Sequence, residues 1–339
     1  MAKAVKLSDI AKKLNVSTVT VSKALSDQKG VSEELRREIK ALASELGYVS
    51  PSAAKMQEEK QSYNIGVIVS SRYFDQTQSF YWVMYKELAT KANNKNCFTV
   101  LEVIEETDEE KNVPPRLLEG DRINGLVVIG IMKDDYLKMV SENSKVPVVY
   151  LDFYCKNVPC DAVVTDNYYG MYAMTDYLCS LGHKKIAYVG TLFATNSITD
   201  RYFGYCKALY ENGIEIRKDY VIPDRFEDNG GKAGFEIKLP EDMPTAFACN
   251  CDVTALTVID LLNERGLRVP EDVSVVGFDD YASRNPKTVG MTTYAVDFKE
   301  MARKTVKILI RKMSGDYSSK GISVVEGKMI IRNSANKLN

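Results

Sequence analysis

The sequence is poor in histidine, tryptophan and uninterrupted apolar sequence. His183 is the only histidine among 339 residues and Trp82 is the only tryptophan. The longest run of apolar residues and glycine extends only from Gly125 to Met132, whereas a membrane-spanning helix needs about 20 apolar residues. The N-terminus also lacks the apolar region of a secretory signal. We therefore expect a cytoplasmic protein without a membrane partner.

Motifs for metal binding and catalysis are also missing. The seven cysteines form no paired Cys-x-x-Cys sets, so we expect reduced thiols, no metal site and no cofactor. No Gly-x-Ser-x-Gly, Walker loop or His-Glu-x-x-His motif is present. Asp279 and Asp280 are adjacent, and in an extended backbone their side chains would diverge rather than face one bond. His183 precedes an expected strand, at the end opposite an expected cleft, so we interpret it as structural. We expect no catalytic function.

A length of 339 residues predicts two or three domains, and the charged residues are distributed unevenly along the chain. The first 57 residues contain ten Lys or Arg and six Asp or Glu, a net charge of +4, whereas the remainder carries −5 and the whole chain −1. A basic N-terminal segment on an acidic body is typical of a nucleic-acid-binding module attached to another domain.

Residues 7–46 show three short helical patterns. Ser8 is a candidate N-cap for the first, Ser17 for the second and Ser32 for the third, which ends at Gly47. The first two, across a tight turn, predict a helix-turn-helix, although the β-branched run 16–21 alone would favour a strand. The second helix of such a motif enters the major groove by its N-terminal residues. We expect base or phosphate contacts from the start of this helix and salt-dependent phosphate contacts from nearby lysines: Ser17, Thr18, Val19, Thr20, Ser22, Lys23, Lys6 and Lys29.

From residue 64 onward, apolar runs alternate with helical patterns. The expected strands begin near residues 65, 97, 125, 146, 161, 185, 245 and 273. Near-continuous apolar strands joined by helices predict parallel sheets covered on both faces, and this number of units exceeds one compact sheet. We predict an α/β core of two doubly wound lobes, behind a small all-α head, with ligands bound at the carboxyl ends of the strands.

The segment DIAKKLNVSTVTVSKAL, followed by VSEELRREIKALASELGY, resembles the DNA-binding domain of the LacI family of transcriptional regulators without a gap. The resemblance implies a hinge helix that enters the minor groove. The matching positions are Ser52, Lys55, Met56 and Gln57. Gln57 stands where the family usually has an intercalating leucine, so either Met56 takes that role through a shifted register or the DNA is bent less.

Pieces of the body, such as SLGHKKIAYVG, PTAFACNCDVTAL and RVPEDVSVVGFDD, are similar to the family's effector-binding core, itself similar to periplasmic sugar-binding proteins. The resemblance implies that Arg201, Asp279 and Cys251 hold a small ligand. Cys251 replaces the family's asparagine, so Asn250 or Asp252 is a candidate substitute. An arginine with a carboxylate also complements the donors and acceptors of sugar hydroxyls.

Further effector contacts are expected from a second carboxylate at a strand end and from aromatic side chains suited to the apolar faces of a sugar. These are Asp152, the segment Phe80, Tyr81 and Trp82, which precedes an expected helix, and Phe298, which carries over from the family as a pocket wall. The expected domains are 1–49 for the helix-turn-helix, 50–63 for the hinge helix and linker, and 64–339 for the core. Lobe 1 is expected at about 64–165 and 293–322, and lobe 2 at about 166–292 and 323–339.

The sequence thus predicts a DNA-binding transcriptional regulator that represses sugar-use genes. We expect it to bind a near-palindromic double-stranded operator as a homodimer, with an affinity that is changed by a sugar between the lobes. Two alternatives stay open. Ligand could tighten DNA binding, as in a corepressor-dependent regulator, or the chain could be a cytoplasmic sugar-binding sensor with a weakened head.

Overall fold

The computed structural model describes residues 5–48, 62–73, 80–227, 233–281, 290–318 and 321–338. The chain divides into two compact units, Met1–Ser62 and Tyr63–Asn339. The hinge candidates Ser52, Lys55, Met56 and Gln57 lie outside the described residues.

The N-terminal unit contains three short helices around one small core. They are α1 (Leu7–Lys13), α2 (Thr18–Leu25) and α3 (Glu33–Glu45). Ser17 caps α2 by accepting a hydrogen bond from the Thr20 backbone N–H at 3.0 Å, and Ser32 caps α3. These two caps and the helical state of the β-branched run confirm the prediction. Helix formation there is supported by packing, because Val21 is fully buried against the other two helices.

The predicted cap of the first helix is wrong. Ser8 lies inside the first turn of α1, and Lys6 is the residue that precedes the helix. The reason is Asp9, whose carboxylate accepts a hydrogen bond from the Lys6 backbone N–H at 2.8 Å, so that the helix begins two residues earlier than predicted.

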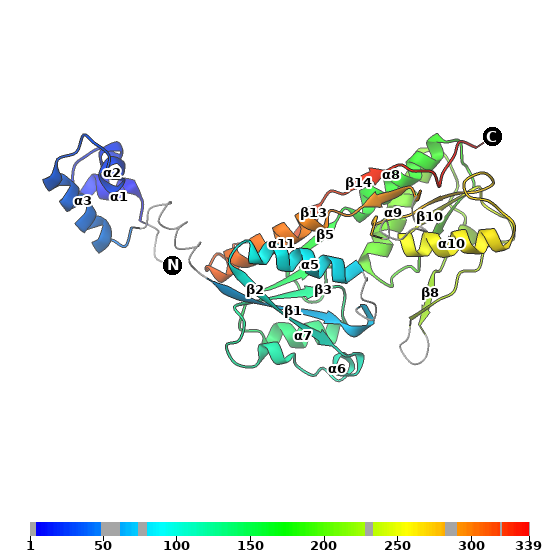
Figure 1. The fold of residues 1–339 in the computed structure, drawn as a ribbon, viewed down its shortest axis with the longest axis horizontal. Coiled ribbons are helices and arrows are strands. Elements are labelled where there is room, and N and C mark those ends of the chain that lie inside the picture. Colours follow the sequence, from blue (N-terminus) through cyan, green and yellow to red (C-terminus); the bar gives the residue numbers. More distant parts are fainter. Residues whose placement is uncertain are drawn as a thin grey trace. The chain divides into compact units, whose positions relative to one another are not determined.

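The C-terminal unit begins with a six-stranded parallel sheet, ordered β13-β5-β4-β3-β1-β2. Its strands are β1 (Tyr63–Ser70), β2 (Cys97–Ile104), β3 (Gly125–Ile129), β4 (Val148–Leu151), β5 (Asp161–Thr165) and β13 (Ile322–Val325). Its helices are α5 (Phe80–Asn93), α6 (Glu106–Glu110), α7 (Asp134–Asn143) and α11 (Phe298–Met313). In Figure 1, α5 and α11 lie along one face and α7 along the other.

The two faces follow from strand periodicity. Val67, Val127 and Val149 contribute to the cluster that contains α5 and α11, whereas Ile68 and Val128 contribute to the cluster that contains α7. Because both faces are covered at the centre of the sheet, strands β3 and β4 are apolar along their whole length, as the sequence predicted.

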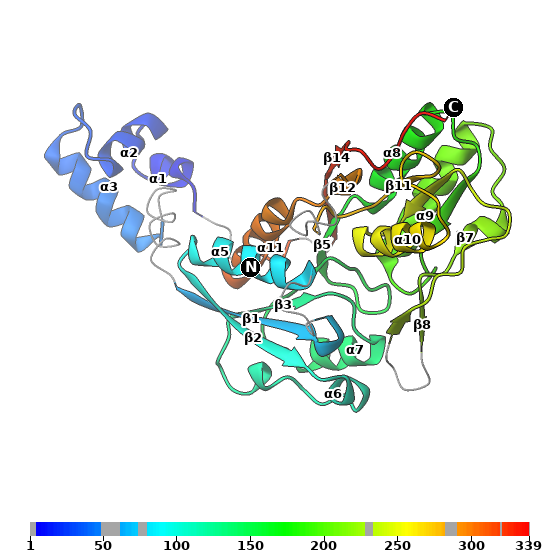
Figure 2. The ribbon, with the colours of Figure 1, turned by 45° about the vertical axis from the view of Figure 1, so that its right-hand side comes forward.

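A second, four-stranded parallel sheet has the order β11-β10-β6-β7. Its strands are β6 (Ile186–Val189), β7 (Val221–Ile222), β10 (Ala246–Cys249) and β11 (Ser274–Val276). The helices around it are α8 (Asn167–Ser180), α9 (Asn196–Glu211) and α10 (Asp252–Glu264). Figure 2 shows α10 in yellow and α8 and α9 in green, and their side chains join different core clusters. Two doubly wound lobes are therefore confirmed.

The chain passes between the two sheets three times, after β5, after β12 and after β13. The eight predicted strands are all present. The sequence reading did not include β7, β13 or the antiparallel pairs β12 (Thr293–Ala295) with β14 (Lys328–Ile330) and β8 (Arg225–Glu227) with β9 (Ala233–Phe235). Most of these segments are short, and several are interrupted by charged residues or glycine, so they lack the apolar runs that identified the others. In the part of the chain that the structure describes, no helix has the length and apolar character to span a bilayer.

Candidate functional site

In the N-terminal unit, the start of α2 presents exposed side chains. Thr18, Ser22 and Lys23 are exposed, and Val19 is 61% exposed although it is apolar. A valine at this position gains nothing from burial within the unit, so its side chain is available for contact with another molecule. Lys6 and Lys29 are also exposed, while Thr20 is half-buried and its hydroxyl lies 2.9 Å from the Ser17 hydroxyl. Ser17 and Thr20 therefore organise the start of α2.

Arg36 is a residue of this unit that the sequence reading missed. Its guanidinium donates to the backbone carbonyls of Ala24 and Gln28, at 3.4 and 2.8 Å, and pairs with Asp27 at 3.2 Å. These bonds attach the end of α2 to α3 and so fix the helix that carries the exposed residues. The spacing along α3 gave no signal for this role, because the partners lie in a turn.

In the C-terminal unit, Arg201 is buried where the two lobes meet. Its side chain donates to the Asn167 amide oxygen at 2.8 Å and to the Asn250 carbonyl at 2.6 Å. The guanidinium carbon lies 3.8 Å from the centre of the Phe278 ring, a cation–π contact. Arg201 is only 6% exposed, so it is not one half of a surface ion pair. Its charge acts on both Asp152 and Asp279. We call these three residues, with Tyr81, the interlobe site.

Asp152 comes from the other lobe, directly after β4, and has a left-handed backbone with φ of 74°. Burial raises its pKa to about 6, although the charge of Arg201 and a hydrogen bond from Tyr81 act in the opposite direction. Among the described residues its Oδ1 atom has no hydrogen-bond partner. A buried carboxylate oxygen without a partner is costly, so this atom is suited to accept a hydrogen bond from a ligand.

Asp279 follows β11 and is 6% exposed. The prediction of an extended backbone at Asp279 and Asp280 is wrong, because both residues are left-handed, with φ of 99° and 49°. Their side chains nevertheless diverge. Asp279 accepts from the Tyr281 backbone N–H at 3.1 Å, while Asp280 pairs with Arg332 at 2.8 Å.

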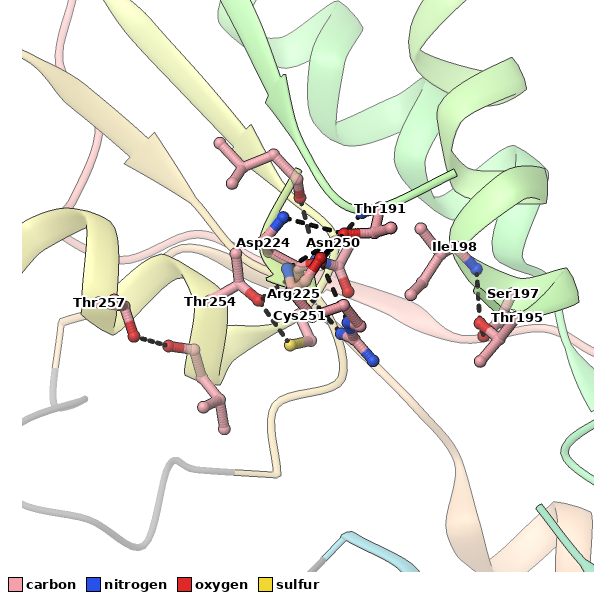
Figure 3. A network of polar contacts seen from close by, with 12 residues as sticks. Thr191, Thr195, Ser197, Ile198, Asp224, Arg225, Asn250, Cys251, Thr254 and Thr257 are labelled. Carbon is pink, nitrogen blue, oxygen red and sulfur yellow. Dashed lines mark hydrogen bonds and ion pairs between the residues drawn. The ribbon is translucent and has the colours of Figure 1, made fainter. Parts of the chain in front are cut away.

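Cys251 and its neighbours Asn250 and Asp252 have different hydrogen-bond partners. The Asn250 amide donates to Asp224 at 2.7 Å and to Thr254 at 3.2 Å, so its side chain belongs to a buried network and only its carbonyl binds Arg201. The Cys251 sulfur lies 3.2 Å from the Thr254 hydroxyl. Figure 3 shows this network around Asp224, which joins the ends of β6 and β10 to α10. Asp252 instead bonds Thr293 at 2.6 Å.

Asp224 is fully buried and anchors Arg225 in the same network. The Arg225 guanidinium donates to both carboxylate oxygens, at 3.1 and 2.9 Å, and Thr191 donates at 2.9 Å through its backbone N–H. Although burial acts to raise the pKa of Asp224, the hydrogen bonds and charge of Arg225 hold it well below its usual range. The carboxylate therefore stays ionised and keeps Arg225 in place.

Aromatic side chains surround the site unevenly. Phe80, Tyr81 and Trp82 form the first turn of α5 rather than preceding the helix, so they point in different directions. The Phe80 ring lies 5.0 Å from Phe298 and 6.2 Å from Tyr281 of the other lobe. Trp82 packs on Tyr85, one turn along the helix, at 5.7 Å. Phe80, Tyr81 and Phe298 are thus brought together, whereas Trp82 packs on Tyr85 of its own helix.

Three residues at or beside the interlobe site were not predicted from the sequence: Asn167, Arg225 and Tyr281. Asn167 stands at the start of α8, two residues after β5, and the rule that ligands bind at strand ends could have identified it. Arg225 is the first residue of the short strand β8, which has no apolar periodicity, and Tyr281 lies two residues beyond Asp279. Neither carries a local signal of its own.

His183 is buried, as the structural interpretation predicted. Its ring nitrogens lie 3.0 Å from the Thr245 and Ser274 hydroxyls and from the Asn336 carbonyl. Burial lowers its pKa, so the imidazole stays neutral at neutral pH. The ring fastens the C-terminal segment to the four-stranded sheet.

All seven cysteines are free thiols, and burial raises the pKa of Cys251 to about 11. Such a thiol is protonated at neutral pH, so it is a weak nucleophile. Within the described ranges, no group of three His, Cys, Asp or Glu side chains is arranged to hold a metal ion.

Two family descriptions match the chain: "Bacterial regulatory proteins, lacI family" over residues 6–51, and "Periplasmic binding protein-like domain" over residues 175–335. The chain thus combines a LacI-family helix-turn-helix domain with a periplasmic-binding-protein-like domain. The first match covers the head with α1, α2 and α3, and the second covers most of the lobe that contains Arg201 and Asp279.

Several known proteins match the chain from end to end. The HTH-type transcriptional repressor PurR of Mannheimia succiniciproducens is 25% identical over 334 residues, which cover 98% of this chain and 99% of the relative. The lac repressor bound to ONPG in the repressed state is 25% identical with a TM-score of 0.64, covering 98% and 100% of the two chains. The complex of the regulator CelR with cellobiose has the same fold, with 24% identity and a TM-score of 0.68, covering 97% and 99%.

Proposed function

We propose that this LacI-family regulator represses sugar-use genes in the cytoplasm and that a sugar between the lobes changes its affinity for an operator. The match of the head to the lacI family and the end-to-end match to PurR repressors support a DNA-binding transcriptional regulator. The observation that carries the effector part is the interlobe site, where a buried arginine and carboxylates from both lobes converge beside aromatic rings.

The head supports DNA recognition through the exposed start of α2. Thr18 and Val19 have the methyl groups that suit thymine, and Lys23 supplies a phosphate contact. The hinge positions Ser52, Lys55, Met56 and Gln57 remain a proposal for minor-groove contact, because they lie outside the described residues.

A sugar is the ligand class that the interlobe chemistry favours. Arg201 and Asp279 offer a donor and an acceptor in fixed geometry, and the Oδ1 atom of Asp152 is open to a hydroxyl donor. The rings of Phe80 and Phe298 suit the apolar face of a pyranose. The CelR relative was solved with cellobiose, which supports this ligand class.

A homodimer on a near-palindromic site follows from the size of the head. One such head buries too little DNA for useful affinity, and two linked heads multiply it. The outer strand β2 exposes Phe98 and Val100, at 58% and 45%, and these apolar side chains support a self-association surface in the core.

The DNA-binding part is tested by selecting duplexes from a random pool with the full-length protein, with and without pooled sugars. We expect an enriched near-palindrome. Val19→Ala should change the preferred bases, whereas Lys23→Ala should weaken all duplexes and reduce the salt slope by about 1. Lys95→Ala is the matched control, because Lys95 is exposed on the C-terminal unit, and this variant should select the same duplexes as the wild type. No enrichment in either arm would contradict the proposal.

The effector part is tested by thermal shift with a panel of sugars. We expect one sugar to raise the melting temperature of the wild type but not that of Asp279→Ala, while Asp260→Ala, exposed on α10, responds like the wild type. Stabilisation retained in Asp279→Ala would remove this residue from the site.

Two alternatives have distinct outcomes in these experiments. Enrichment only with sugar present would indicate a corepressor-dependent regulator. Sugar-induced stabilisation without any DNA enrichment would indicate a sugar-binding sensor with a weakened head. A non-enzymatic role is supported because the carboxyl groups of Asp252 and Asp279 contact each other, which leaves no space for a glycosidic bond between them.

A further inference from the structure

Two carboxyl groups that are far apart in the sequence meet beside the interlobe site. Asp252 is the first residue of α10, and Asp279 follows β11. They are 1% and 6% exposed, and their side chains are in hydrogen-bond contact.

The chemistry of this contact requires a proton. An ionised carboxylate only accepts hydrogen bonds, so two ionised groups cannot bond each other and instead repel in a buried site. One group must carry a proton that it donates to the other. The same reasoning explains why buried carboxyl pairs titrate as a unit rather than as two independent acids.

The backbone holds both groups in place. The Asp252 backbone N–H donates to the Phe278 carbonyl at 2.8 Å, and its Oδ1 accepts from the Thr293 hydroxyl at 2.6 Å. A Cβ atom at Gly277 would lie 2.2 Å from this Oδ1, so only glycine admits the carboxyl group there. The Asp279 backbone N–H donates to the Tyr294 carbonyl at 2.7 Å. The contact therefore joins α10 to the strand end and to β12.

The surrounding charges are unevenly placed. Arg201 faces Asp279 from α9, while Arg332 and Asp280 face Asp252 and bond each other. The Cys251 thiol and Tyr281 lie beside Asp279. Burial raises the pKa of Asp252, and burial together with the Asp252 carboxyl raises the pKa of Asp279 well above its usual range. The charge of Arg201 acts against the shift of Asp279 without reversing it.

We propose that Asp252 and Asp279 share a single proton and that Asp252 is thereby the positioning residue for the carboxyl group that Asp279 presents to the effector. The shared proton links α10 to the left-handed turn at Asp279 and Asp280. The role toward an effector rests on the proposed function, whereas the shared proton itself is a property of the ligand-free protein.

Infrared spectroscopy of the ligand-free, full-length protein tests the proton directly. At about pH 8, above the ordinary range of carboxyl groups, the wild type should show a carboxylic-acid C=O band. Asp252→Asn should lose this band, because an amide N–H replaces the shared proton, and Asp279→Asn should lose it as well. Asp260→Asn, on the exposed face of the same helix, should keep it.

The pH dependence of the melting temperature gives a second readout. Because the pKa of the pair is raised in the folded protein, the shared proton adds to the free energy of unfolding at low pH. This stabilisation is lost as the pH rises through the folded pKa. The wild type and Asp260→Asn should therefore lose melting temperature with rising pH, and Asp252→Asn should show a shallower slope. A purely structural contact would lower the melting temperature of Asp252→Asn equally at every pH.

The shared proton and the proposed effector role can be contradicted independently of each other. A wild type without the band, or a band that survives both Asp252→Asn and Asp279→Asn, would overturn the shared proton whatever the cleft binds. If the band behaves as expected but no sugar stabilises the protein, the shared proton stands and the proposed effector does not.

Discussion

The two units of the chain present their functional residues in opposite ways. At the start of α2 in the head, Thr18, Val19 and Lys23 are exposed and make no core contact, whereas Arg201 and Asp279 of the core are buried among fixed partners. A surface that reads DNA can be supported by one short helix, because its partner brings the complementary groups. A site that holds a small ligand must be assembled from distant strands and helices. Substitutions should therefore cost more stability in the core than in the head.

The largest effect is expected for Asp224→Ala. This buried carboxylate accepts hydrogen bonds from Thr191, Arg225, Asn250 and Thr254, and its removal leaves these donors and a charge unpaired. We expect a loss of about 3 kcal/mol in the free energy of unfolding, measured by denaturant titration of the full chain.

Asp242→Ala is the matched control, because Asp242 is half-exposed and its ion pairs with Lys185 and Arg217 are screened by solvent. It should change stability little. Equal losses in the two variants would show that the network around Asp224 is not what stabilises the interlobe site.

Gly204→Ala should have the next largest effect. A Cβ atom there would lie 2.1 Å from the Tyr168 carbonyl oxygen, so α8 and α9 must separate. Since these helices carry Asn167 and Arg201, we expect a loss of about 2 kcal/mol in the free energy of unfolding and a reduced thermal response to the effector. Gly213→Ala probes a site with open space, although its φ of 65° adds local strain, and should leave the effector response intact. An unchanged response in Gly204→Ala would contradict the rigid placement of Arg201.

In the head, Ser17→Ala should have a smaller effect. The loss of the N-cap bond to Thr20 should lower the stability of α2 by about 1 kcal/mol, detected as faster amide hydrogen exchange in residues 18–25. Exchange in the core should not change. Ser22→Ala, exposed on the same helix, serves as the stability control, and an equal acceleration there would mean that the cap does not determine the helix start.

The smallest effect is expected from pH acting on His183. Because burial lowers its folded pKa, the neutral ring stabilises the core above the unfolded value of about 6.5, and stability falls as pH drops from there toward the folded pKa. His183→Gln should flatten this part of the melting-temperature profile of the core. A profile identical to that of the wild type would mean that the bonds to Thr245 and Asn336 do not depend on the neutral ring.

The same contrast explains what the sequence could predict. The helices of the head and the apolar strands follow from local periodicity, and Asp152 and Asp279 were found because strand ends are recognisable in sequence. Asn167 and Arg225 were missed because their partners, Arg201 and Asp224, are defined only by the folded arrangement of loops and helix starts. The contact between Asp252 and Asp279 joins residues 27 positions apart and has no local pattern. The predicted cap at Ser8 was wrong because the Asp9 carboxylate accepts a hydrogen bond from the Lys6 backbone N–H and starts the helix there.

Coupling between the interlobe site and the head is tested by the affinity of the full-length protein for its selected duplex, measured with and without the sugar that stabilises it. We expect saturating sugar to change the Kd for the duplex, and saturating duplex to change the Kd for the sugar by the same factor. An operator Kd that is identical in both conditions would contradict the proposed coupling between the interlobe site and the head.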